Sequence, residues 1–129
     1  MARILVVDDH DSVRTALRRI LEADGHRVEE ADDGREAMHI LDEGRSDLVI
    51  ADVYMPVMDG IEFLIRLVDR HPAIPVIAMS GGAYAPAGFV LRDARRLGAA
   101  ATLEKPLVMD RVIGEVRRVI ADKDKEASP

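Results

Sequence analysis

The chain has 129 residues, of which 48% are hydrophobic and 33% are charged, and its formal net charge is −6. This length is typical of one domain that can bury a core. The absence of cysteine excludes a disulfide scaffold, a thiolate metal site and a cysteine nucleophile. The acidic balance disfavours a nucleic-acid module, and no apolar run approaches the roughly 20 residues that span a bilayer. We therefore expect a cytoplasmic protein with no nucleic-acid partner and no membrane insertion.

Five short apolar runs alternate with longer amphipathic stretches. Nearly all-apolar runs of this length predict strands that are buried on both faces, as in a parallel sheet. The runs cover residues 4–7, 28–31, 48–51, 76–79 and 99–103.

The stretch that follows each run has helical periodicity; in the first, Val13, Leu17 and Ile20 recur every three or four residues. Glycines expected just after helices are Gly25, Gly44 and Gly98, and aspartates expected as N-caps are Asp11, Asp33 and Asp59. Five strand–helix pairs in succession predict an α/β fold, a doubly wound (βα)5 unit with a five-stranded parallel sheet. We place the domain at residues 1–121 and expect the polar segment 122–129 to be a disordered tail.

Polar residues stand at the ends of four predicted strands. Asp8 and Asp9 follow the first strand, Asp52 the third, Ser80 the fourth and Lys105 the fifth. In a doubly wound sheet these strand ends meet in one crevice. Taken singly, each residue also suits a turn, a helix cap or a solvated surface. Their convergence at one edge favours a functional site.

Three carboxylates in one crevice repel each other unless cations lie nearby. Mg²⁺ prefers oxygen ligands, so Asp8, Asp9 and Asp52 are its candidate ligands, and Lys105 adds a fixed positive charge. A carboxylate in such a setting can accept a phosphoryl group as an acyl phosphate, with Ser80 and Lys105 binding the phosphoryl oxygens.

Four segments in order resemble the receiver domain of bacterial two-component response regulators, over roughly residues 2–120. They read ILVVDD at 4–9, DVYMPVMDG at 52–60, PVIAMSG at 75–81, and GA at 98–99 followed by LEKP at 103–106. The resemblance implies the flavodoxin-like strand order 2-1-3-4-5, for which a member of this family is already a standard example.

The resemblance also implies site roles. Asp52 would accept the phosphoryl group from a histidine kinase or a histidine phosphotransfer protein. The acid pair, Asp52 and the backbone carbonyl of Tyr54 would hold Mg²⁺, while Ser80 and Lys105 would bind the phosphoryl oxygens. A cis peptide bond between Lys105 and Pro106 would aim the lysine into the site.

The sequence departs from the family pattern at several positions. Thr102 stands where the family usually has Tyr or Phe as a switch residue. Threonine is too small to act as such a switch, so we expect the response to phosphorylation to differ from that of the family. Tyr84, in a lengthened loop at 81–88, is a candidate substitute. Leu107 replaces a common Phe, a change of packing. Gly82 cannot orient an attacking water and Tyr54 can shield the phosphoryl group, so we expect slow self-dephosphorylation.

Three other interpretations stay open. The segment DHDSV at 9–13 resembles the signature of haloacid-dehalogenase-type phosphatases, with Asp9 as nucleophile and Asp11 as acid. A serine hydrolase built on Ser80 is weaker, because all four histidines precede that serine and the fold needs one after it. A receiver-like interaction module that is never phosphorylated is the non-enzymatic alternative.

No output domain is expected after the receiver. We therefore expect a stand-alone receiver, not a classical enzyme, that acts as a monomer or weak homodimer. It would bind an unknown target protein, or serve as a shuttle or sink in a phosphorelay.

Overall fold

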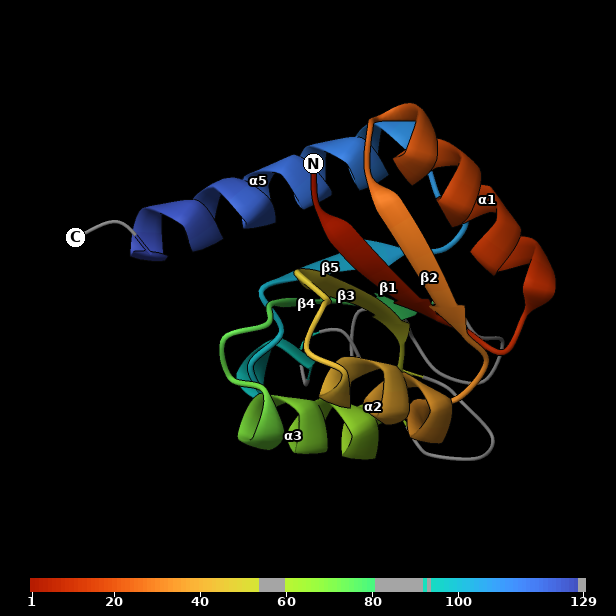
Figure 1. The fold of residues 1–129 in the computed structure, drawn as a ribbon. Helices are drawn as coiled ribbons and strands as arrows, with labels where there is room; N and C mark the ends of the chain where they lie inside the picture. The colour runs from red at the N-terminus through yellow and green to blue at the C-terminus, as the bar shows by residue number, and fades with distance from the viewer. Residues whose placement is uncertain (54–59, 81–91, 93, 128–129) are drawn as a thin grey trace.

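The computed structural model describes residues 1–53, 60–80, 92 and 94–127. Its elements are β1 (Arg3–Val7), α1 (Asp11–Ala23), β2 (Arg27–Ala31), α2 (Gly34–Asp42), β3 (Leu48–Asp52), α3 (Gly60–Arg70), β4 (Val76–Ser80), β5 (Ala101–Glu104) and α5 (Met109–Ala127). The strands form one parallel sheet in the order β2-β1-β3-β4-β5, so the predicted α/β fold and strand order are confirmed (Figure 1).

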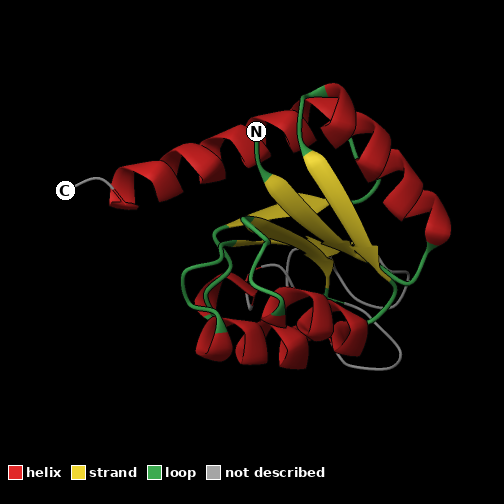
Figure 2. Cartoon of the chain, viewed as in Figure 1, coloured by secondary structure: helices red, strands yellow, loops and turns green. Residues whose placement is uncertain are grey.

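Helices cover both faces of the sheet, with α1 and α5 on one side and α2 and α3 on the other (Figures 1 and 2). The alternation of side chains along β1 shows how two cores arise from one apolar run. Leu5 and Val7 pack in the cluster that includes residues of α2 and α3, whereas Ile4 and Val6 pack in the cluster that includes residues of α1 and α5. All four are at most 1% exposed. Burial on both faces explains why the strand sequence is apolar at every position rather than at every second one.

The turns after the helices follow the sequence prediction. Gly25, Gly44 and Gly98 all have positive φ, between 80° and 116°. Gly98 is doubly constrained, because a Cβ built there would lie 3.1 Å from Cγ2 of Val68. A side chain at position 98 would therefore meet both backbone strain and a steric contact.

The three predicted N-caps have different outcomes. The carboxylate of Asp33 accepts a hydrogen bond from the backbone N–H of Glu36 at 2.9 Å, so this cap is confirmed. The prediction for Asp11 is wrong, because His10 occupies the N-cap of α1 and Asp11 is the first helical residue. The side chain of Asp11 instead pairs with Arg14 one turn later. Asp59 lies outside the described residues.

Two element boundaries differ from the sequence prediction. The fifth strand begins at Ala101 rather than at residue 99, because the backbone N–H of Ala99 still bonds the carbonyl of Ala94 at 3.0 Å, in the turn through Gly98. The segment 122–127, expected in a disordered tail, belongs to α5. Lys123 contributes to this, since its Nζ donates to the backbone carbonyl of Asp47 at 3.1 Å. The division of the chain at residue 121 stays a prediction.

The predicted fourth helix lies partly outside the described residues. Arg92 and residues 94–96 are helical, and Ala94 is buried in the cluster shared with α2 and α3. Across the described chain, none of the helices is both long and apolar enough to cross a membrane.

An ion pair links the end of α1 to α5. Arg117 donates two hydrogen bonds to the Asp24 carboxylate, at 2.5 and 3.2 Å, and these bonds hold the pKa of Asp24 below its usual value. A lowered folded pKa means that the pair stabilises the protein above the unfolded pKa and that this contribution is lost as pH falls through the folded pKa. We expect Asp24→Asn to be less stable than the wild type at pH 7 and equally stable in acid.

Urea unfolding followed by circular dichroism at a series of pH values checks this expectation. Asp122→Asn is the matched control. Asp122 lies on α5, the helix that carries Arg117, and its well-exposed side chain is 3.7 Å from Arg118. A stability difference for Asp24→Asn that persisted unchanged at acid pH would show that the ion pair is not its cause.

Candidate functional site

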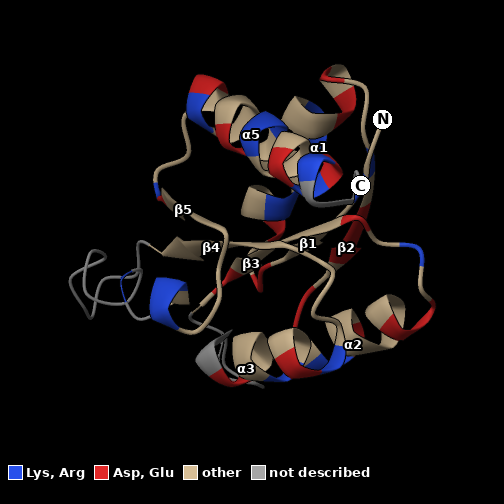
Figure 3. Cartoon of the chain, turned by 90° about the vertical axis from the view of Figure 1, so that its left-hand side faces the viewer, with Lys and Arg blue, Asp and Glu red and all other residues tan. Residues whose placement is uncertain are grey.

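The strand ends bring the predicted site residues to one edge of the sheet. Asp8 directly follows β1, Asp52 and Ser80 are the last residues of β3 and β4, and Lys105 directly follows β5. Because the sheet is parallel and β1, β3, β4 and β5 are adjacent in it, these four positions lie at the same edge. Figure 3 shows the sheet between its two helical layers, with charged residues (blue and red) on the helices of both layers.

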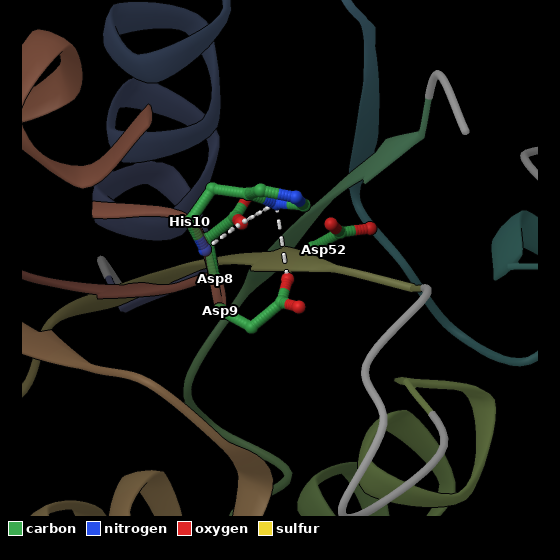
Figure 4. Close-up of side chains that lie close together, drawn as sticks. All are labelled: Asp8, Asp9, His10 and Asp52. Carbon is green, nitrogen blue, oxygen red and sulfur yellow. Dashed lines mark hydrogen bonds and ion pairs between the residues drawn. The ribbon is translucent and has the colours of Figure 1, made fainter. Parts of the chain in front are cut away.

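The carboxylates gather as the sequence predicts, and a histidine joins them. One ligand atom from each of Asp8, Asp9, His10 and Asp52 lies within 4.8 Å of the other three (Figure 4). Asp8 and Asp52 are 0% and 4% exposed, whereas Asp9 and His10 face the solvent. The cluster is therefore anchored in the core on one side and accessible on the other.

Lys105 supplies the positive charge at the buried side of this cluster. Its Nζ donates to Oδ2 of Asp8 at 2.8 Å and to Oδ2 of Asp52 at 3.0 Å. Burial acts to lower the pKa of Lys105, but the hydrogen bonds to the two carboxylates outweigh it, and the pKa lies above its usual value. The ammonium group is therefore charged at neutral pH and offsets the repulsion between the two aspartates.

The backbone fixes these side chains in place. The N–H of Asp8 bonds the carbonyl of Ala31 at 3.1 Å, and Arg14 donates to the Asp8 carbonyl. The N–H of Lys105 bonds the carbonyl of Ser80 at 2.8 Å, which extends the β4–β5 pairing by one residue. The Lys105–Pro106 peptide bond is cis, as the family resemblance implies.

Ser80 contributes a buried hydroxyl. The residue is 0% exposed, and its Oγ has no hydrogen-bond partner in the part of the chain that the structure describes. A buried hydroxyl is stabilised when it has a hydrogen-bond partner, and buried polar groups in native proteins nearly always have one. The hydroxyl is available to an oxygen-bearing group bound at this edge.

His10 is a residue of the cluster that the sequence analysis did not single out. Its Nδ1 lies 3.1 Å from Oδ1 of Asp8 and 3.1 Å from Oδ1 of Asp9 (Figure 4). Its position immediately after the acid pair was the signal that could have found it. Asp11, in contrast, is not part of the cluster, because its side chain is turned toward Arg14.

The structure describes some, but not all, of the other positions that the sequence analysis singled out. Thr102 pairs with Ala78 of β4 and is partly exposed, and Leu107 packs at the edge of the core shared with α1 and α5. Tyr54, Gly82 and Tyr84 lie outside the described residues, so the carbonyl ligand, the phosphate lifetime and the substitute switch residue stay predictions.

Comparisons with known proteins agree with this arrangement. The family described as response regulator receiver domain matches residues 4–117. Response regulator MprA of Mycolicibacterium vanbaalenii is 36% identical over 118 residues, which are 92% of this chain and 50% of that protein. Chemotaxis protein CheY of Listeria monocytogenes is 38% identical over 114 residues, which are 88% of this chain and 93% of that protein.

A solved structure has the same fold. The CheY-like response regulator receiver domain protein of Methanospirillum hungatei superposes with a TM-score of 0.88 at 26% identity, over 98% of each chain. The chain spans about half the length of the MprA regulators that it matches.

Proposed function

This chain belongs to the response regulator receiver family, and we propose that Asp52 accepts a phosphoryl group from a histidine kinase or a histidine phosphotransfer protein. The observation that carries the proposal is the setting of Asp52. Asp52 is 4% exposed and ends a central strand, and its carboxylate lies 3.0 Å from the Lys105 ammonium. A carboxylate held in this way is a nucleophile with a fixed cation beside the charge that develops on the phosphoryl oxygens.

The proposed phosphoryl transfer is a displacement at phosphorus. An Asp52 carboxylate oxygen forms the new O–P bond, and the N–P bond to the donor imidazole breaks, which returns a histidine. Lys105 and the buried hydroxyl of Ser80 would each bind a phosphoryl oxygen, which gives the Ser80 Oγ the partner that the described residues do not supply.

The donor set fits Mg²⁺, because the oxygen atoms of Asp8, Asp9 and Asp52 converge within 4.8 Å. Bound there, the ion would supply neutralising charge for the phosphoryl oxygens. The lysine alone balances one of the three carboxylate charges, so the remaining negative charge favours a divalent cation. The backbone carbonyl of Tyr54 is the further ligand that we propose from the family.

We propose that the domain acts in the cytoplasm as a phosphoacceptor, not as a classical enzyme. Its output would be contact with a target protein or transfer of the phosphoryl group to another histidine. Because Thr102 lacks the aromatic ring of the usual switch residue, phosphorylation would alter the contact surface through a different structural change. The phosphatase interpretation is disfavoured, because its acid Asp11 is paired with Arg14 away from the carboxylate cluster.

Intact mass spectrometry tests the proposal. We expect incubation with Mg²⁺ and a small acyl phosphate donor to add one phosphoryl group, EDTA to prevent the gain, and Asp52→Asn to abolish it. A gain in EDTA, or an equal gain in Asp52→Asn, would contradict the proposed chemistry. If neither the small donor nor a phosphorylated phosphotransfer protein modifies the wild type, the chain is a phosphorylation-independent module and the proposal fails.

A further inference from the structure

An imidazole nitrogen is part of the carboxylate cluster. Nδ1 of His10 lies 3.1 Å from Oδ1 of Asp8 and 3.1 Å from Oδ1 of Asp9, and it belongs to the four-residue group within 4.8 Å that also contains Asp52 (Figure 4). The magnesium site proposed above uses oxygen ligands alone. His10 therefore adds a candidate nitrogen ligand, which an all-oxygen site lacks.

The spacing of these atoms suits a shared metal ion. Adjacent ligands of an octahedral site with metal–ligand distances of about 2.1 Å lie about 3.0 Å apart. The two distances of 3.1 Å from His10 Nδ1 match such adjacent positions. The widest separation in the group, at most 4.8 Å, exceeds the about 4.2 Å expected for opposite ligands, so side chains need to close in by only a few tenths of an ångström each.

Local structure keeps the imidazole at the site. The backbone N–H of His10 donates to Oδ1 of Asp8 at 2.9 Å, which ties the residue to the carboxylate that it accompanies. His10 is the N-cap of α1, but its side chain makes no capping hydrogen bond. On the other side of the cluster, Lys105 holds the Oδ2 atoms of Asp8 and Asp52. The imidazole thus lies across the carboxylates from the lysine, on the solvent-facing side.

We propose that His10 makes this a mixed nitrogen–oxygen site that selects borderline transition-metal ions, such as Zn²⁺ and Co²⁺, over Mg²⁺. Imidazole suits these ions, whereas carboxylates alone suit Mg²⁺, and affinity for nitrogen-containing sites rises along the first transition series. The inference rests on the proposed metal role of the three aspartates. Its consequence is regulatory, because a transition-metal ion would compete with Mg²⁺ for the site that supports phosphoryl transfer.

Calorimetric titration of the purified chain with Co²⁺, and separately with Mg²⁺, tests the selectivity. We expect His10→Gln to lower the ratio of Co²⁺ affinity to Mg²⁺ affinity by about tenfold or more, the effect typical of disturbing a metal's ligand environment. His39→Gln is the matched control, because His39 is an exposed histidine on α2 outside the cluster, and the ratio should not change. An unchanged ratio in His10→Gln, or an equal fall in His39→Gln, would overturn the inference.

A second readout uses the wild-type chain, so it does not depend on how a variant folds. Four histidines give a simple imidazole ¹⁵N spectrum, and we expect Zn²⁺ to shift Nδ1 of His10 whereas Mg²⁺ does not. No selective shift at His10 would refute nitrogen ligation. If Mg²⁺ still supports phosphorylation of Asp52 in that case, only this inference fails; if Mg²⁺ does not, the proposed function fails as well.

Discussion

Replacing Lys105 by methionine is expected to destabilise the metal-free protein by about 3 kcal/mol. The change removes the ammonium group that bridges Asp8 and Asp52, and it leaves two buried carboxylates facing each other. Removing one partner from a buried ion pair typically costs about 3–5 kcal/mol. The lower end applies here, because 18% of the Lys105 side chain is exposed and solvent screens part of the charge.

The same variant should respond more strongly to Mg²⁺ than the wild type does. Without the lysine, the carboxylates have more to gain from a divalent cation, so Mg²⁺ should recover part of the lost stability. Urea unfolding with and without Mg²⁺ measures both effects. Lys123→Met is the matched control, because Lys123 contacts Asp47 on the far side of the fold from the cluster; it should lose much less stability and show no response to Mg²⁺. Equal behaviour of the two variants would show that the Lys105 bridge is not what stabilises the site.

Replacing Phe63 by alanine is expected to lower the free energy of unfolding by about 3–5 kcal/mol, the range typical of large-to-small changes in a core. Phe63 lies on α3, is 0% exposed, and packs in the cluster that includes Val49 and Ala51 of the strand carrying Asp52. Domains of this kind are stable by only about 5–15 kcal/mol, so the loss is a large fraction of the total.

Chemical denaturation measures this loss, and α3 itself supplies the control. Ile65 lies two residues further along α3 and is 50% exposed, so Ile65→Ala should change stability by about 0.5 kcal/mol or less. A small effect at Phe63, similar to that at Ile65, would mean that α3 does not support the core beneath the site as the structure describes.

The strands and their order could be predicted because burial on both faces leaves a clear mark in the sequence. Every residue of 4–7 had to be apolar, and the following Asp8 stands out as the first polar residue after that strand. The parallel order then brings together residues such as Asp8 and Lys105, which are 97 positions apart. The predicted carboxylate cluster, with its lysine, follows from topology rather than from local spacing.

Other features depend on contacts that the sequence pattern does not encode. The position of His10 in the cluster results from the path of the backbone out of β1 and from a hydrogen bond to Asp8. The extension of α5 through 122–127 escaped prediction because that segment is polar, and polar composition alone does not distinguish an exposed helix from a tail. The Ser80 hydroxyl has no hydrogen-bond partner among the described residues, and this is known only once the neighbours of the strand end are placed.

Reductive trapping tests most directly whether Asp52 is the site of covalent attachment. Borohydride reduces an aspartyl phosphate to homoserine, so the chain is phosphorylated with Mg²⁺ and an acyl phosphate donor, reduced, digested and sequenced by mass spectrometry. We predict homoserine at position 52, with Asp8 and Asp9 unchanged. Homoserine at position 9 would instead support the phosphatase-type nucleophile, and a stable phosphate on Ser80 would contradict the acyl phosphate account altogether.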